Sequence, residues 1–201
     1  MTKHSATKSE GDAIIVTGTP GTGKTNFAKK LAEEIGGKYI SLTQYVSRQK
    51  LYTAVDRERR TKIIDIKKTS ASLRELLSTM RRPVVIETNI PDGILPRQRP
   101  RQVFVLRCHP RIMEGRLRRK KWDAMKIREN VLAEILDACL LNALEYYGSD
   151  KIMQLDASRM SLKECLGTAR RILSGRKTKR VISIDWIRTL EREGILHRYL
   201  R

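Results

Sequence analysis

The sequence predicts a three-layer α/β fold, in which helices cover both faces of a parallel sheet. The first observation is that short apolar runs rich in β-branched residues alternate with helical patterns along the chain. The second is a glycine-rich turn placed between the first apolar run and the first helical pattern. The third is size, because 201 residues, 40% of them hydrophobic, can bury one core without disulfides or a structural metal.

The first expected strand is residues 13–17 (AIIVT), whose unbroken apolar character is typical of a strand buried on both faces. A helix is expected from Thr25 to Ile35, because Phe27 and Leu31 recur on one face of a 3.6-residue period. The glycine pair at residues 36–37 ends it.

Further strands are expected where short apolar runs recur, at residues 38–41, 83–87, 102–106 and 151–155. Further helices are expected at residues 43–49, 72–80, 110–119, 123–147 and 161–175. Ser72 with Glu75, and Ser161 with Glu164, have the spacing of a capping box, and Asp123 is expected to cap one long helix running to Tyr147. Residues 51–60 are expected to be irregular, residues 63–66 to be a brief apolar run, and residues 91–100 to be a loop.

Three segments are expected along the chain. Residues 1–12 are polar and read as a flexible tail, and residues 13–174 form the α/β domain. Residues 175–201 read as a basic extension: a linker (GRKTKR), then a strand at 181–184 and a helix at 185–193 with Trp186 and Leu190 inward. We expect nucleotide chemistry to survive removal of this extension.

Composition excludes several classes of protein. No apolar run approaches the ~18 residues of a membrane span, and the N-terminal stretch lacks the apolar centre of a secretory signal. The three cysteines are far apart and odd in number, which argues against a disulfide framework or a CxxC metal site. A reducing, cytoplasmic location is therefore expected.

The charge balance points to phosphate-rich partners. Lys and Arg total 42 against 22 Asp and Glu, a net charge of +20, and residues 97–121 hold ten basic residues and one acid. Such a chain should attract nucleotides or nucleic acid in a salt-dependent way. The alternative is a basic surface that is merely solvated, as in proteins adapted to high temperature.

Residues 18–25 (GTPGTGKT) match the phosphate-binding pattern GxxxxGK[S/T] and lie between an expected strand and helix. Glycines let backbone amides wrap phosphate oxygens, and the helix N-terminus favours negative charge. Lys24 should reach the β- and γ-phosphates of ATP, and the Thr25 hydroxyl should bind Mg²⁺. The alternative is a chance match in a glycine-rich turn. The residues expected to bind the nucleotide are Gly21, Thr22, Gly23, Lys24, Thr25 and Asn26.

Phosphoryl transfer also needs an acid near the metal and cations near the moving group. Glu87, at the end of an expected buried strand, is the candidate acid; the alternative is a surface carboxylate. Arg116 and Lys120 belong to a basic segment expected to form a lid that closes over the transferring phosphate. The other members of this segment are Arg107, Arg111, Arg118, Arg119 and Lys121. The alternative for that segment is an exposed basic helix end.

Three segments together resemble the family of adenylate kinase isoenzyme six, the coilin-interacting nuclear ATPase family of eukaryotes and archaea. They are residues 18–25, 52–65 and 116–134, and the pattern RL…W…KI.EN….E in the last is more specific than the loop. The resemblance spans about residues 13–173. It implies a nucleoside monophosphate kinase fold with a monophosphate-binding segment around 41–64 and a short lid around 119–129.

The resemblance further implies adenylate kinase activity (ATP + AMP = 2 ADP), ATPase activity and a role in late maturation of the small ribosomal subunit. The implied partners there are a platform ribosomal protein and ribosomal RNA. The family usually has Asp-x-His where this chain has Glu87-Thr88-Asn89, and Asn cannot accept a proton as His does. Lys120 stands where the family usually has Arg. Arg159 matches a region that lines the adenine in the family; the alternative interpretation of Arg159 is a surface side chain.

Three hypotheses follow. The first is an ATP-dependent kinase of AMP or another nucleoside monophosphate, with ATPase activity. The second is a nucleotide-switched ribosome assembly factor that mainly binds a ribosomal protein or RNA. The third is a kinase of another small acceptor. The preferred monophosphate and the oligomeric state stay open at this point.

Overall fold

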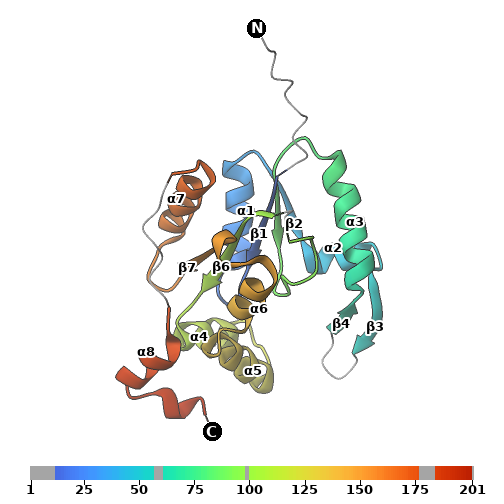
Figure 1. Cartoon of the computed structure of the whole chain (residues 1–201). Helices are drawn as coiled ribbons and strands as arrows, with labels where there is room; N and C mark the ends of the chain where they lie inside the picture. The colour runs from blue at the N-terminus through green and yellow to red at the C-terminus, as the bar shows by residue number, and fades with distance from the viewer. Residues whose placement is uncertain (1–11, 57–60, 98–99, 177–183, 201) are drawn as a thin grey trace.

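The computed structural model describes residues 12–56, 61–97, 100–176 and 184–200. It contains a sheet of five parallel strands in the order β2-β5-β1-β6-β7 (Figure 1). The strands are β1 (Ala13–Thr17), β2 (Lys38–Ser41), β5 (Val84–Glu87), β6 (Pro100–Arg107) and β7 (Ile152–Asp156). The three-layer α/β prediction is therefore confirmed.

Alternate side chains of the central strands point to opposite faces of the sheet. Ile15 and Ile86 pack on one face with α2 (Leu42–Arg48), α3 (Ile66–Thr79) and α6 (Ala138–Tyr147). Ile14 and Val85 pack on the other face with α1 (Lys24–Glu34) and α7 (Leu162–Leu173). Because both faces are covered, the central strands β1 and β5 are almost entirely apolar, as the sequence indicated.

A third apolar cluster lies beside the sheet. It joins α4 (Pro110–Arg119) and α5 (Ala124–Ile135) with Leu190 of α8 (Trp186–Arg192). Two short 3₁₀ turns, η1 (Ser149–Lys151) and η2 (Leu196–Arg198), complete the elements of the described chain. Trp186 and Leu190 are buried, which confirms the inward face expected for this helix.

The structure corrects the expected irregular segment at 51–60. A hairpin of β3 (Tyr52–Asp56) and β4 (Thr61–Ile64) lies here, antiparallel and apart from the main sheet. Polar residues predicted a loop, but most of the described side chains of both strands are exposed to solvent, so no apolar alternation was required. Residues 57–60 lie outside the described part of the chain.

Two helix predictions were wrong. The α3 helix begins at Ile66, capped by the Asp65 carboxylate, which accepts from the Lys68 amide at 3.0 Å. The expected cap, Ser72, lies within the helix, where its hydroxyl bonds to Tyr45 at 2.6 Å. The expected long helix at 123–147 is two helices, because Asp137 adopts a left-handed conformation (φ 58°) between α5 and α6.

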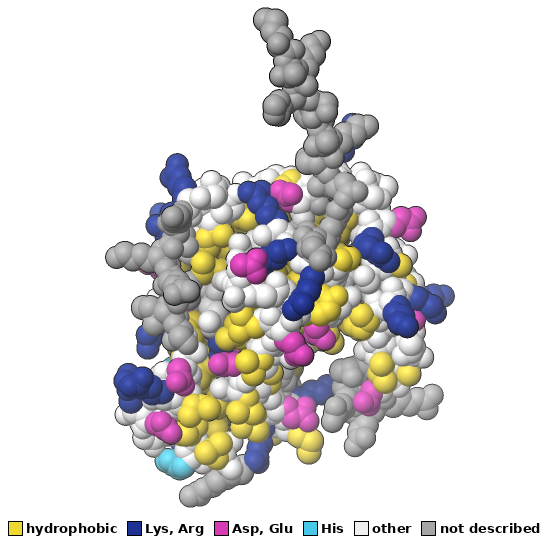
Figure 2. Space-filling model, viewed as in Figure 1, with side chains coloured by type: hydrophobic (Ala, Val, Ile, Leu, Met, Phe, Trp, Pro, Cys, Tyr) yellow, Lys and Arg dark blue, Asp and Glu magenta, His cyan; other side chains and the backbone are white. Residues whose placement is uncertain are grey.

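Residues 1–11 of the expected tail and most of the 175–180 linker fall outside the described residues, as do residues 181–183 of the expected C-terminal strand. In the described residues no helix is long and apolar enough to cross a membrane. In the space-filling view, basic side chains are spread over the visible face with acidic ones among them (Figure 2). The face shown therefore carries no single basic patch.

Candidate active site

The phosphate-binding loop joins the end of β1 to the start of α1, as the motif predicted. Gly21 has φ 99°, and a Cβ there would lie 2.7 Å from Met113 Cγ of α4. Gly18 has φ 142°, and a Cβ there would lie 2.4 Å from the Leu106 carbonyl oxygen. Both positions need glycine because the loop runs close to its neighbours in a conformation that side chains disfavour.

The loop is also held by its own threonines. The Thr22 amide and hydroxyl both donate to the Thr19 carbonyl, at 3.2 and 2.9 Å. The Thr19 hydroxyl donates to Glu134 Oε2 at 2.6 Å, within the buried interior. The loop is thereby shaped before any phosphate binds, which lowers the entropy cost of binding.

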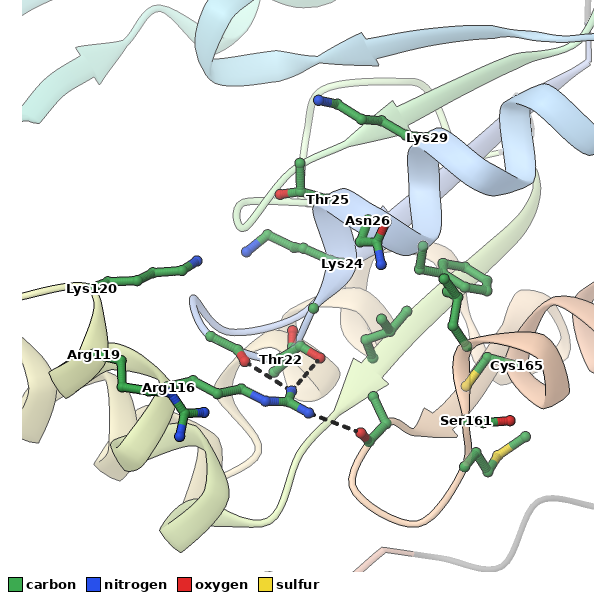
Figure 3. Close-up of a pocket in the computed structure, with 17 residues that line it drawn as sticks. Thr22, Lys24, Thr25, Asn26, Lys29, Arg116, Arg119, Lys120, Ser161 and Cys165 are labelled. Carbon is green, nitrogen blue, oxygen red and sulfur yellow. Dashed lines mark hydrogen bonds between the residues drawn. The ribbon is translucent and has the colours of Figure 1, made fainter.

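A cavity of about 810 Å³ opens over this loop (Figure 3). One part is cationic, with Lys24, Lys29, Arg116, Arg119 and Lys120 in its lining. Another part is largely apolar, with lining residues Phe27, Leu106, Ala157, Met160, Leu162 and Cys165. A cavity with a cationic part and an apolar part suits a ligand that joins phosphates to a flat, weakly polar ring.

Lys24 is almost fully enclosed at the start of α1, with 8% of the residue exposed. Burial lowers the pKa of its ammonium group, while nearby Glu87 acts in the opposite direction. Its side chain and that of Lys120 point toward one another across the cavity (Figure 3). Two converging ammonium groups repel, so an anion between them would be stabilised by both.

Glu87, at the carboxyl end of β5, is held by two hydroxyl groups. The Thr25 hydroxyl donates to Oε1 at 2.9 Å, and the Tyr39 hydroxyl donates to Oε2 at 2.8 Å. Burial, together with the bond to Glu87, raises the pKa of Tyr39, so this phenol stays a donor. A hydroxyl and a carboxylate side by side form the kind of all-oxygen donor set that Mg²⁺ takes along with phosphates and water. These residues fit the metal expected from the sequence.

Arg116 is anchored to the loop itself. Its Nη1 donates to the carbonyl oxygens of Gly21 and Thr22 at 3.2 and 3.3 Å, and Nη2 donates to the Ala157 carbonyl at 3.4 Å. The guanidinium therefore joins α4, the phosphate-binding loop and the segment after β7. Its charge stands beside the cavity in a fixed position.

The structure gathers most of the residues expected at the site. Gly21, Thr22, Gly23, Lys24, Thr25, Asn26, Arg116 and Lys120 line the cavity. Glu87 reaches it through Thr25. Arg159 is not in the cavity lining: its side chain is 75% exposed and its Nε lies 3.6 Å from Asp156 Oδ2.

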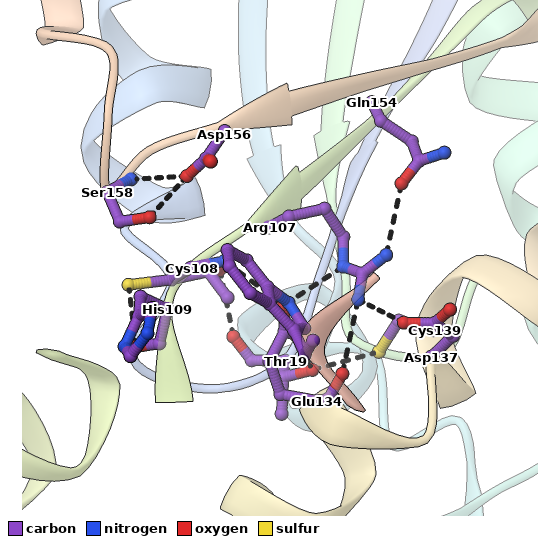
Figure 4. A network of polar contacts seen from close by, with 12 residues as sticks. Thr19, Arg107, Cys108, His109, Glu134, Asp137, Cys139, Gln154, Asp156 and Ser158 are labelled. Carbon is purple, nitrogen blue, oxygen red and sulfur yellow. Dashed lines mark hydrogen bonds and ion pairs between the residues drawn. The ribbon is translucent and has the colours of Figure 1, made fainter. Parts of the chain in front are cut away.

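Sequence reasoning missed the polar network behind the loop. Arg107 Nε donates to Glu134 Oε1 at 2.9 Å, and both side chains are buried (Figure 4). Arg107 was assigned to the basic lid segment, whereas its guanidinium lies in the interior at the end of β6. A signal was present, because Glu134 shares the buried face of α5 with Ile127 and Val131. An acid on an apolar face indicates a buried partner.

Known proteins resemble this chain over most of its length. The model of a family described as AAA domain matches residues 14–137. A protein of Saccharolobus solfataricus described as "Putative adenylate kinase" is 40% identical over 153 residues, covering 76% of this chain and 79% of that protein. One of Pyrococcus abyssi with the same description is 32% identical over 174 residues, covering 86% and 90%.

Solved structures share the fold at low identity. Shikimate kinase from Acinetobacter baumannii, solved with shikimate, has a TM-score of 0.55 at 15% identity, covering 84% of this chain and 96% of that one. Deoxyadenosine kinase from M. mycoides has a TM-score of 0.54 at 10% identity, covering 81% and 99%. These likenesses establish an α/β P-loop kinase fold. The sequence relatives go further, and the chain belongs to the archaeal family of AAA-domain nucleotide kinases whose members are described as "Putative adenylate kinase".

Proposed function

We propose that this protein transfers the γ-phosphoryl group of ATP to a nucleoside monophosphate, with AMP as the first acceptor, giving two ADP. The observation that carries the proposal is the convergence of Lys24, Arg116 and Lys120 on one cavity that is also lined by Thr25, whose hydroxyl is bonded to Glu87. Membership of a family whose relatives are described as adenylate kinases supports AMP as the acceptor.

In this reaction an oxygen of the acceptor phosphate attacks the γ-phosphorus, and the bond from that phosphorus to the β–γ bridging oxygen breaks. The acceptor is already ionised at neutral pH, so no general base is needed. Lys24 and Lys120 would stabilise negative charge on the transferring group. Thr25 and Glu87 would hold Mg²⁺, which neutralises the phosphate charge when bound.

Hydrolysis of ATP is expected to be slow compared with transfer. Water, unlike a phosphate, must lose a proton when it attacks. The end of β5 and the two residues after it read Glu87-Thr88-Asn89, and the Asn89 amide cannot accept that proton.

The activity can be tested by mixing the protein with ATP, Mg²⁺ and AMP and measuring ADP. We expect ADP well beyond that formed from ATP alone. Lys24→Met should lower this rate at least about 100-fold, because it removes a cation from the transferring phosphate. Lys30→Met is the matched control, since Lys30 lies on the same helix, pairs with Glu33 and is absent from the cavity lining. Equal rates in the two variants would contradict the site.

A second candidate is nucleotide-controlled binding of ribosomal RNA or a ribosomal protein, the role implied by resemblance to the isoenzyme-six family. The net charge of +20 supports it, since such a chain attracts polyanions. It would be favoured over the kinase if ATP turnover were insensitive to AMP but changed on addition of RNA. Its affinity for RNA should then fall steeply as salt rises.

A further inference from the structure

The carboxylate of Glu134 is the centre of a buried network that joins three distant parts of the chain (Figure 4). Oε2 accepts from the Thr19 hydroxyl of the phosphate-binding loop at 2.6 Å. Oε1 accepts from Arg107 Nε at 2.9 Å, from the Cys108 amide at 3.0 Å and from the indole Nε1 of Trp186 at 2.9 Å. A carboxylate that is 2% exposed depends on these donors in place of water.

Trp186 brings the C-terminal helix α8 into this network. Its side chain is buried, and its ring lies edge-on to His109 with the ring centres 5.4 Å apart. The Arg107 guanidinium lies 5.9 Å from the indole ring. His109 also contacts Glu193, just after α8, at 3.0 Å. The indole therefore sits among groups that belong to β6 and to the turn before α4.

A second path joins α8 to the loop through α4. Leu190 of α8 is fully buried in one cluster with Met113 and Leu117. Those two side chains lie directly against Gly21, where a Cβ would meet Met113 Cγ at 2.7 Å and Leu117 Cγ at 3.2 Å. The α4 helix, which carries Met113 and Leu117, also supplies Arg116, which donates to the Gly21 carbonyl. The helix α8 thus supports the loop both through Glu134 and through α4.

We propose that Trp186 is a positioning residue for the phosphate-binding loop, so that docking of α8 and binding of ATP stabilise each other. This inference rests on the proposed use of ATP at the loop. Without the indole donor, Oε1 of Glu134 loses one of its partners, and the carboxylate can turn away from Thr19 to recover one. Linkage requires the effect to be reciprocal: if α8 strengthens ATP binding, ATP strengthens the docking of α8.

Trp186→Phe tests the donor while keeping an aromatic ring in the core. We expect the dissociation constant for ATP with Mg²⁺, measured by calorimetry, to rise at least about fivefold, the lower end of a typical coupling between sites. The rate at saturating ATP and AMP should change little, because no cavity residue is altered. The matched control is Ile187→Ala on the same helix, where 42% of the residue is exposed, and its affinity should equal that of the wild type.

Thr19→Val removes the donor at the other end of the network while keeping its shape. The double variant combines Thr19→Val with Trp186→Phe. If Glu134 transmits the effect, the dissociation constant of the double variant for ATP should rise by less than the product of the two single-variant increases. Strict multiplication of the two effects, or wild-type affinity in Trp186→Phe, would overturn the inference while leaving the kinase proposal intact. Absence of ATP binding by the wild-type protein would overturn both.

Hydrogen exchange on the wild-type protein provides a test that needs no variant. Backbone amides of α8 should exchange at least about fivefold more slowly when ATP and Mg²⁺ are present. Unchanged exchange in α8, with ATP bound, would contradict the proposed coupling. Deleting α8 would be a poorer experiment, because it also removes Leu190 from the apolar cluster it shares with α4 and α5.

Discussion

Glu87 illustrates how a single side chain is placed by its neighbours. Glutamate has one more carbon than aspartate and therefore more freedom at the end of a strand. Here both carboxylate oxygens are fixed, Oε1 by Thr25 and Oε2 by Tyr39. Tyr39 lies on β2, whose register places Ser41 opposite Glu87 on the adjacent strand. The neighbouring strand thus restrains the acid that the sequence assigned to the metal.

Replacing Tyr39 with Phe should weaken the affinity of the protein for Mg²⁺ without abolishing binding. The phenol orients the carboxylate from outside the metal site, and loss of such a group typically lowers metal affinity by about 10-fold or more. The measurement is ADP formation as a function of Mg²⁺ concentration, with half-saturation expected at roughly 10-fold higher Mg²⁺. Tyr45→Phe is the control, because its hydroxyl bonds to Ser72 and does not contact Glu87.

At the scale of an element, α3 shows what a cap contributes. The Asp65 carboxylate accepts from the amide of Lys68 at 3.0 Å, which satisfies a donor at the helix start that otherwise lacks a partner. That backbone bond, more than the nearby Lys68 charge, lowers the pKa of Asp65 below its ordinary value. The ionised form is therefore favoured in the folded state.

Asp65→Ala should lower the melting temperature by roughly 2–4 °C at pH 7, the usual effect of losing a cap in a domain of this size. Since folding lowers this pKa, the contribution is present above the unfolded pKa and is lost as the pH falls through the folded one. The melting temperatures of the wild type and the variant should therefore draw together as the pH falls below the ordinary pKa of an aspartate. Glu75→Ala is the control, because this exposed acid lies within the same helix. An equal effect of Glu75→Ala would show that the cap is not the cause.

At the scale of the whole molecule, the elements that surround the cavity come from distant parts of the sequence. The loop lies near the N-terminus, Arg116 and Lys120 come from the middle, and Met160 and Cys165 come from beyond β7. A ligand that fills this cavity joins all of them. Binding should therefore stabilise the folded chain as a unit.

ATP with Mg²⁺ at about 100 times its dissociation constant should stabilise the fold by about 2.7 kcal/mol. For a chain of this length, that corresponds to a rise of roughly 5–10 °C in melting temperature. Thermal unfolding followed by circular dichroism measures it, and Lys24→Met at the same ATP concentration should show little or no rise. A wild-type melting temperature that does not respond to ATP would contradict the assignment of the cavity.

The sequence by itself determined the parts that depend on local order. Residues 18–25 are contiguous, and the glycines, Lys24 and Thr25 function through backbone geometry set within a few residues. The strands of the sheet were also visible, because strands buried on both faces are continuously apolar. The hairpin of β3 and β4 could not be predicted in this way, since most of its described side chains face solvent and show no alternation of apolar and polar residues.

Only the tertiary structure decided the contacts between distant residues. Glu134 meets Thr19, Arg107 and Trp186 because α5, the end of β6 and α8 converge behind the loop. The break at Asp137 belongs to the same region, since Arg107 also bonds to the Asp137 carboxylate. The C-terminal segment, expected to be dispensable, contributes a buried indole to this network. Helical periodicity shows that a residue faces inward, but its partner is selected by packing between elements far apart in the chain.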